Sequence, residues 1–483
     1  MDTTVAIPRG NRITLRIRAN IFCDALHEDS SDTTITAIII KSKAMKRIRW
    51  RCNCSIRPRG MIPDSVLQRR LFCLRRTHEA PRVPRDVTKD TGVIPKGTTL
   101  QGRNILFAVT GGIAAVESIR LARELRRHGA DLTIMMSKEA EKIITPLALS
   151  WASGTEVLTD WDHTMVQLDD YDSVLIAPAT RNTISKHVHG IMDSPILMAL
   201  TAARGNGTPI LFVPSMHSDL FDDRVTADLL EALDTEGSSV MADEVVEGRR
   251  KQPDPVSIVA NLCNLVNAQL PNRKVVAITL GANRAPIDAV RAIQNASSGS
   301  TGWSIAEHLH RMGHHVICIA GKTSADPGFS LPDVRRGGSP DEMLSVSKTV
   351  ALGQPKPDVW IHSAAVLDYY TEPLTEKKAS GADFWKLTLS PGPKHISELK
   401  PLVDGAIRIG FKLESGVSED VLIQRAKDQI ETYEVDAVVA NLKEEVHDPK
   451  SLRSRIVYPD GTVEDIHDDA GLCQAIESLL HTS

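Results

Sequence analysis

The sequence after residue 102 alternates between short apolar runs and amphipathic stretches. Four runs have the length and composition of buried strands: 104–110, 131–136, 173–179 and 209–214. Between the first two, apolar residues recur at helical spacing in VESIRLARELRRHG, and Gly129 is placed to end that helix. Strands that alternate with helices in this way predict a parallel, doubly wound sheet.

The same pattern restarts after the segment QLPNRK, at about residues 268–273. A helix is predicted in WSIAEHLHRMG. The strands predicted for this second half are 274–280, 315–321, 358–365, 406–411 and 435–441. We therefore predict an α/β fold with two doubly wound, mainly parallel-sheet domains in tandem, flavodoxin-like or Rossmann-like, covering residues 101–270 and 271–483.

The first hundred residues differ from the rest in charge and patterning. Residues 1–100 hold 20 Lys and Arg against 9 Asp and Glu, a net charge of +11, while the remainder holds 37 against 52, or −15. Residues 41–87 show little periodicity and many Arg and Pro, so we expect a basic, poorly ordered extension. The alternative is an arm that binds nucleic acid. Cys52 and Cys54 have the wrong spacing for a zinc site.

Composition narrows the class of protein further. The chain has 483 residues, 42% of them apolar and 24% charged, which is typical of globular domains. Aromatic residues make up only 4%, which argues against stacking of nucleic-acid bases. No apolar run approaches a membrane-spanning length, and the first residues lack the apolar core of a secretory signal. Seven scattered cysteines favour a reducing compartment, so we expect a cytoplasmic protein.

Two glycine-containing turns carry the candidate chemistry. VTGGIAAVE follows the first predicted strand, and QNASSGSTG lies between a strand and a helix of the second half. Neither matches the P-loop or the G-x-G-x-x-G fingerprint. Both nevertheless precede a helix, whose free N–H groups favour phosphate, at the edge where open parallel sheets bind ligands.

These segments, with VLIAPATRNTISKHVHGIMDSPI and FVPSMHSDLF, resemble the flavin-dependent cysteine decarboxylases. More broadly, residues 102–483 resemble the bifunctional family of coenzyme A biosynthesis, which joins a phosphopantothenoylcysteine decarboxylase to a phosphopantothenate–cysteine ligase. The resemblance implies FMN as cofactor of the first domain. The residues it places around FMN are Gly111, Gly112, Ile113, Ala114, Ser137, Pro178, Ala179, Thr180 and Asn182.

The resemblance also implies two histidines as catalytic groups of the flavin domain. His163 in DWDHTMVQLDDYD is the candidate for the family's histidine before the third strand, although it lies one residue further from the strand than usual. A solvated loop histidine is the alternative. His217 in PSMH stands where bacterial members place an Asn that holds the substrate carboxylate. The bacterial flap cysteine has no counterpart, and Cys263 lies later in a predicted helix; these departures resemble the archaeal form of the family.

For the second domain the resemblance implies CTP-dependent activation of 4′-phosphopantothenate, with Mg²⁺, followed by attack of cysteine on an acyl-cytidylate. Asn295 and Lys377 match the family's catalytic residues. The residues implied to bind substrate or nucleotide are Arg291, Ser297, Ser298, Gly299, Ala364, Ala365, Asp368, Pro393, Lys394, Ile396 and Phe411. Gln429 and Tyr433 replace two bacterial lysines, which leaves the choice between CTP and ATP open.

Other functions are compatible with the same residues. One is a ligase whose flavin domain is degenerate, because the flap cysteine is absent and His163 is displaced. Another is a flavin-binding regulatory protein without catalysis. The family's flavin sites usually form between subunits, so the resemblance also implies a homo-oligomer.

Overall fold

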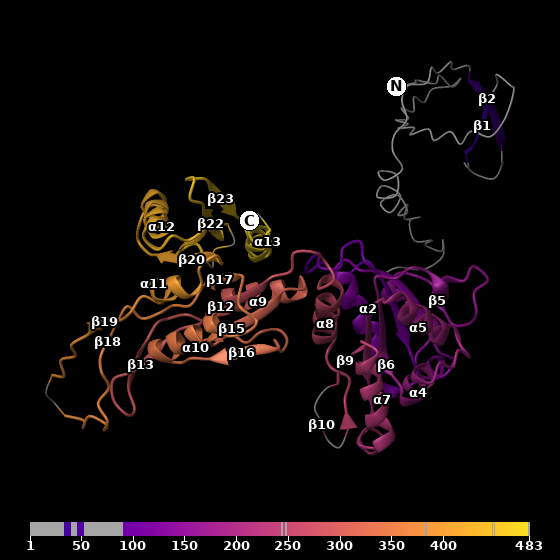
Figure 1. Cartoon of the computed structure of the whole chain (residues 1–483), viewed down its shortest axis with the longest axis horizontal. Helices are drawn as coiled ribbons and strands as arrows, with labels where there is room; N and C mark the ends of the chain where they lie inside the picture. The colour runs from indigo at the N-terminus through magenta and orange to yellow at the C-terminus, as the bar shows by residue number, and fades with distance from the viewer. Residues whose placement is uncertain are drawn as a thin grey trace. The chain divides into compact units, whose positions relative to one another are not determined.

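The computed structural model of the chain describes residues 90–242, 251–381, 384–446, 448 and 450–481 (Figure 1). It also gives the backbone of strands β1 (Thr33–Ile39), β2 (Lys46–Cys52), β10 (Val245–Val246) and β11 (Arg249–Arg250). The chain forms two units, Met1–Ala80 and Pro81–Ser483. In the first unit β1 pairs with β2 in antiparallel fashion, and the remainder of residues 1–89, with the side chains of Cys52 and Cys54, lies outside the described residues. Residues 90–100, which the prediction included in the extension, are described, and Leu100 is buried.

The first half of the second unit contains a six-stranded parallel sheet with the order β5-β4-β3-β6-β7-β9. All four strands predicted for this half are present, and their central residues are buried because both faces are covered. The strands are β3 (Asn104–Val109), β4 (Asp131–Met136), β5 (Val157–Leu158), β6 (Ser173–Ala179), β7 (Ile210–Pro214) and β9 (Ser239–Val240).

Helices cover both faces of this sheet, as the doubly wound prediction requires. One apolar cluster joins the sheet to α2 (Ser118–Arg127), α3 (Pro146–Ser153) and α8 (Pro255–Asn267). The cluster on the opposite face involves α4 (Arg181–Val188), α5 (Pro195–Asn206) and α7 (Arg224–Thr235). Alternation along β3 explains the division, because Ile105 and Phe107 belong to the first cluster and Leu106 and Ala108 to the second.

The second half contains an eight-stranded sheet with the order β16-β15-β12-β17-β20-β21-β22-β23. Its first six strands are parallel, as predicted, whereas β22 and β23 form an antiparallel hairpin that the apolar pattern did not indicate. The strands are β12 (Val275–Leu280), β15 (His315–Ala320), β16 (Asp333–Arg336), β17 (Val359–His362), β20 (Ile407–Glu414), β21 (Ala437–Leu442), β22 (Ser454–Val457) and β23 (Val463–Ile466).

Helices again lie on both faces of the larger sheet. α9 (Ser300–Arg311) and α13 (Asp469–Leu479) pack on one face. α10 (Pro340–Leu352), α11 (His395–Leu399) and α12 (Glu419–Tyr433) pack on the other. No helix among the residues with described positions is both long and apolar enough to span a bilayer.

Helix α9 begins three residues before the predicted helix, inside the serine-rich turn. Gly299 has φ +81°, which a residue with a side chain rarely adopts, and it forms the N-cap. Gly302 then lies so close to β12 that a Cβ atom there would be 2.4 Å from the Cβ of Leu280. The glycines therefore let the helix start directly against the end of the strand, and the turn's serines lie at the helix N-terminus.

Candidate functional site

Four turns meet at the carboxyl edge of the first sheet, where the resemblance places FMN. At Gly111 an added Cβ would lie 2.2 Å from the Cβ of Glu139, and at Gly112 it would lie 3.5 Å from Pro178 Cγ and 3.7 Å from the Ser215 carbonyl oxygen. The glycine pair thus lies against the loop that follows β4, the end of β6 and the loop that follows β7. The approach at Gly111 requires a residue without a side chain, whereas the distances at Gly112 are ordinary van der Waals contacts.

The hydroxyl of Thr110 holds two of these turns together. Thr110 Oγ1 donates to the carbonyl of Pro178 at 2.7 Å and accepts from the N–H of Thr180 at 3.0 Å. The Pro178 carbonyl also accepts from the Thr110 N–H at 3.4 Å, so both the backbone and the side chain of Thr110 bind this strand end. Thr110 was not predicted as a site residue, although it directly precedes the glycine pair in the sequence. Its partners are 68 and 70 residues away, so only the tertiary structure reveals its role.

Ser137 directly follows β4, and its hydroxyl group can still donate a hydrogen bond. Its N–H donates to the Val109 carbonyl at 3.0 Å, and its Oγ accepts from the N–H of Ala140 at 3.2 Å. The hydroxyl can therefore still donate to a phosphate oxygen. The next residue, Lys138, lies 3.4 Å from both Glu141 and Asp160. These groups fit the phosphate end of FMN.

The remaining predicted flavin contacts follow the same strand ends. Thr180 is the N-cap of α4, and its Oγ1 accepts from the N–H of Thr183 at 3.3 Å. Asn182 is exposed in the first turn of that helix. Ile113 and Ala114 begin a short 3-10 helix, η2 (Ile113–Glu117), and the Ile113 side chain is 78% exposed. The predicted residues Pro178 and Ala179 complete the end of β6.

His163 lies apart from this group. Its side chain is 94% exposed, and its contact in the described structure is with Asp162, 3.9 Å from its Nδ1. The loop that carries it is tethered to the flavin turns through Asp160, which pairs with Lys138. The role assigned to His163 therefore remains a prediction.

His217 ends the short strand β8 (Met216–His217), directly after β7. Its Nδ1 lies 3.2 Å from the Asp219 carboxylate. β8 pairs with β11, which belongs to the segment where bacterial relatives carry the flap cysteine, and Arg249 is the register partner of His217. Cys263 cannot replace that cysteine, because it is fully buried in α8, and burial raises the pKa of its thiol to about 11.

In the second half, three turns meet at the carboxyl edge around Gly281. Ala282 forms single bridges to Lys322 and to Ala365. Gly281 has φ +79°, and an added Cβ would lie 2.8 Å from the Lys322 carbonyl oxygen. The backbone of the predicted nucleotide residues Ala364 and Ala365 is thereby fixed beside the start of the serine-rich turn.

Asn295 is held by this framework. Its side-chain Nδ2 donates to the Ala365 carbonyl at 3.0 Å. Its backbone carbonyl accepts from the N–H of Ser297 at 3.1 Å. Ser298 Oγ accepts from the N–H of Ser300 at 3.3 Å. The structure thus brings Asn295, the two serines and Ala365 together, at the N-terminus of α9, where backbone N–H groups favour anionic oxygens.

Asp288 organises a second part of the edge and was not predicted. Its carboxylate accepts from the N–H groups of Val290, Arg291 and Lys378 and pairs with the Arg291 guanidinium. Burial raises the pKa of this carboxyl, but the hydrogen bonds outweigh burial and hold the pKa well below its usual range. Arg291 therefore acts as an anchor here, and the exposed Lys377 lies next to the anchored Lys378.

Asp368 and Lys394 form an ion pair of 2.5 Å between segments that are 26 residues apart. Pro393 directly precedes Lys394, and Ile396 lies in the first turn of α11. Phe411 lies in β20 and packs partly against the core beneath α9. The structure therefore joins two of the predicted residues, Asp368 and Lys394, directly.

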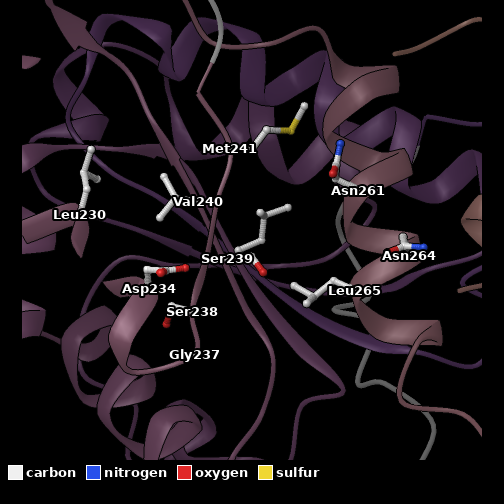
Figure 2. Close-up of a pocket in the computed structure, with 11 residues that line it drawn as sticks. Leu230, Asp234, Gly237, Ser238, Ser239, Val240, Met241, Asn261, Asn264 and Leu265 are labelled. Atoms are coloured by element: carbon white, nitrogen blue, oxygen red, sulfur yellow. The ribbon is translucent and has the colours of Figure 1, made fainter. Parts of the chain in front are cut away.

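Two other features lie away from these edges. A cavity of about 500 Å³ opens beside β9, with side chains of α7 and α8 on either side of the strand (Figure 2). It contains none of the predicted site residues. Among the described residues, the group that could hold a metal ion is His314, Glu477 and His481, at the amino-terminal end of β15 and the end of α13.

Comparison with known proteins identifies both halves. The flavoprotein family model matches residues 94–271, and the model of the DNA/pantothenate metabolism flavoprotein C-terminal domain matches residues 271–469. The chain is 37% identical over 353 residues to the coenzyme A biosynthesis bifunctional protein CoaBC of Thermococcus kodakarensis, covering 72% of this chain and 87% of the relative. The CoaBC protein of Methanocaldococcus jannaschii is 32% identical over 351 residues, covering 72% and 85%.

A solved structure, the DNA/pantothenate metabolism flavoprotein from Streptococcus pneumoniae, overlaps 43% of this chain and 98% of its own. Its sequence identity is 23% and its TM-score is 0.39.

Proposed function

The chain belongs to the family of coenzyme A biosynthesis bifunctional proteins, and we propose how its own residues carry out the two steps. It is a phosphopantothenate–cysteine ligase and a phosphopantothenoylcysteine decarboxylase, with the ligase in the second half and the flavin-dependent decarboxylase in the first. The observation that carries the proposal is the meeting of predicted residues at each sheet edge, above all Asn295 with Ala365.

For the ligase we propose CTP as the activating nucleotide. The carboxylate of 4′-phosphopantothenate attacks the α-phosphorus of CTP, which gives an acyl-cytidylate and pyrophosphate. The cysteine amine then attacks the acyl carbon, and CMP leaves with the bonding electrons. Ser297, Ser298 and the N-terminus of α9 supply donors for anionic oxygens, and Lys377 and Lys394 supply positive charge.

We propose that Asn295 acts on the acyl group. Because its Nδ2 is fixed by the Ala365 carbonyl, its Oδ1 is free to accept from the incoming amine. Replacing Asn295 with Ala should let pyrophosphate form once per site while phosphopantothenoylcysteine does not accumulate. Unchanged turnover in this variant would remove the assignment.

Mg²⁺ is proposed to enter with the triphosphate. The cluster of His314, Glu477 and His481 is remote from Asn295 along the strands, so among the described residues it does not supply a magnesium site for the ligase. In nucleotide-dependent enzymes Mg²⁺ usually keeps several waters and is otherwise bound by one or two carboxylates together with the phosphates of the substrate.

For the decarboxylase we propose that Gly111, Gly112 and Ser137 hold FMN, and the fit of these residues supports it. Bound FMN supplies the reversible two-electron oxidation that makes loss of carbon dioxide from the cysteinyl group easy. We propose that His217, whose Nδ1 lies 3.2 Å from the Asp219 carboxylate, binds the substrate carboxylate and that His163 carries the proton. We also propose a homo-oligomer, as the resemblance to the family implies.

One experiment tests both steps. The protein is incubated with 4′-phosphopantothenate, CTP, Mg²⁺ and cysteine, and the products are identified by mass. Formation of 4′-phosphopantetheine with carbon dioxide, CMP and pyrophosphate is expected. A reaction that stops at phosphopantothenoylcysteine would identify a ligase with an inactive flavin domain, and a colourless protein that cannot be reconstituted with FMN would exclude the flavin step.

A further inference from the structure

Two uncharged polar residues, His362 and Gln429, both neighbour Gly410 near the carboxyl edge of the larger sheet. His362 ends β17, and its register partner on the neighbouring strand is Gly410 of β20. Gln429 of α12 covers that glycine, because a Cβ on Gly410 would lie 2.6 Å from Gln429 Nε2. The amide can occupy this place because residue 410 has no side chain.

Both groups lie on the face that α10, α11 and α12 cover. Along β17, Trp360 belongs to the apolar cluster of that face and Ile361 to the opposite one. His362 therefore shares the side of Trp360, and their rings are stacked with centroids 6.1 Å apart. The same alternation continues to Ala364, a predicted nucleotide contact, which packs against the same cluster.

The alternation along β20 places Gly410 on the same face of the sheet as His362. Ile409 packs in the cluster on the opposite face, so Gly410 opens toward α11 and α12, as does Arg408. The Arg408 guanidinium donates to the carbonyls of Ile396 and Tyr433. The Arg408 guanidinium thus binds α11 and the end of α12 to the sheet. The His362 imidazole and the Gln429 amide are then the groups of this face that can bind a ligand.

His362 has an unused hydrogen-bonding atom. Its Nε2 is buried and has no partner among the described residues. Such an atom is costly unless a ligand or water satisfies it. Burial, followed by the charges of Arg408 and His395, lowers the pKa of His362 to about 3, so the ring is neutral at physiological pH. A neutral imidazole and an amide each offer both a donor and an acceptor.

We propose that His362 and Gln429 bind the nucleobase of the activating nucleotide through uncharged hydrogen bonds. This inference rests on the proposed ligase function. Phosphate is better served by the N-terminus of α9 and by Lys377 and Lys394, whereas a cytosine edge presents one amine donor beside two acceptors. A site built to hydrogen-bond a particular group discriminates strongly against an analogue that lacks it. Gln429 therefore gives base selectivity at the position where bacterial relatives carry a lysine.

The test compares nucleotides in His362→Ala and Gln429→Ala. Each variant should raise KM for CTP at least 10-fold and reduce the preference for CTP over UTP by a similar factor. The KM values for phosphopantothenate and cysteine should stay within twofold. Gln424→Ala is the matched control, because Gln424 lies on the same helix but is exposed and donates to Asp428. It should behave as the unaltered protein.

Gly410→Ala tests whether the position of the Gln429 amide matters, without changing Gln429 itself. The added methyl meets the end of a flexible side chain, so the strand should fold while the Gln429 amide is displaced. This variant should also weaken CTP preference. His362→Phe serves if His362→Ala does not fold by circular dichroism, because a phenyl ring can keep the stacking on Trp360 and has no hydrogen-bonding atom.

An unchanged CTP-to-UTP ratio in the His362 and Gln429 variants would overturn the inference, as would a loss confined to phosphopantothenate. In both cases the unaltered protein still turns over. If the unaltered protein releases no pyrophosphate, the proposed function fails instead, and equilibrium dialysis with CTP alone then decides the inference. Failure of the unaltered protein to bind CTP would overturn it, and 10-fold weaker binding by the variants would support it.

Discussion

Lys394 Nζ lies 2.5 Å from Asp368 Oδ1, and this contact joins the turn after β17 to the start of α11. The two side chains are each about half exposed, at 50% and 55%. Exposed ion pairs contribute only about 0–1 kcal/mol to stability, so the pair is better explained as a way to orient two charged groups beside the proposed nucleotide site.

Lys394→Gln should therefore impair activity more than stability. We expect KM for CTP to rise roughly 10-fold, because one cation near the phosphates is lost, while the melting temperature changes by less than about 2 °C. Steady-state pyrophosphate release and thermal unfolding measure the two effects. Lys348→Gln is the matched control, since Lys348 and Glu398 form a similarly exposed pair between α10 and α11. An equal loss of activity in the control would contradict the prediction.

Gly111→Ala should expel FMN. The added Cβ would lie 2.2 Å from Glu139 Cβ and 3.1 Å from its backbone carbon, so the backbone must shift. Overpacking of this kind costs about 1–3 kcal/mol and moves the turn that holds the cofactor. The ratio of flavin absorbance to protein after purification should fall at least fivefold. Gly205→Ala is the control, because that glycine of α5 has nothing within 4 Å of an added Cβ and should keep its FMN.

The apolar pattern predicted the sheets well because their strands are short and buried on both faces. β3 and β6 could be identified in this way, and β12 likewise. The pattern did not indicate the hairpin of β22 and β23, whose outer strand is partly polar and short. It also placed the start of α9 too late, because glycines and serines are typical of loops and only the close approach of Gly302 to Leu280 makes them helical.

The candidate sites could be predicted only as far as local motifs reach. The family motifs identified Asn295 and the serines. The structure shows that Asn295 binds the Ala365 carbonyl, 70 residues away. Thr110 and Asp288 were not predicted as site residues, because a threonine or an aspartate is common in turns. Their significance comes from hydrogen bonds to backbone groups that are distant in the sequence. A sequence pattern does not reveal such partners.

The segment that begins at Asp90 should be needed for stability, unlike the residues before it. Asp90 lies 2.8 Å from Arg123 Nε, and Lys96 lies 2.7 Å from the buried Glu124 carboxylate. The N–H of Leu100 also donates to the carbonyl of His128 at 2.8 Å. A chain lacking residues 1–89 should keep both activities and its melting temperature.

Deletion of residues 1–99 should lower the melting temperature of the flavin half by several degrees, because the contacts of Asp90 with Arg123 and of Lys96 with Glu124 are lost together. FMN release on heating reports on that half. Equal melting temperatures for the two truncated chains would contradict the assignment. Two point variants measure the contribution of the Lys96–Glu124 ion pair alone. Lys96→Met should lower the melting temperature, whereas the control Lys142→Met, at the end of η3 (Ala140–Lys142), should not.

The second half should lose stability as the pH falls from about 6.5 toward 4. Burial lowers the pKa of His310 and of His314 to about 4, and the neighbouring charges of Arg311 and Arg273, respectively, act in the same direction. In the unfolded chain both groups titrate near pH 6.5. The unfolded state therefore binds protons that the native state does not, and the stability that these neutral rings provide is complete above pH 6.5 and lost below it.

By pH 5 the loss should be on the order of 2 kcal/mol for each of the two histidines. Urea unfolding at pH 7.5 and at pH 5 measures it, followed by the fluorescence of Trp303 and Trp360, which are buried in the second half. His314→Asn should remove about half of the pH dependence, because an amide keeps an acceptor for the Lys274 N–H and does not titrate. His315→Asn is the control, since His315 is exposed in the next position. If His314→Asn retains the full dependence, or His315→Asn loses it, protons taken up by other groups must account for the decline in stability.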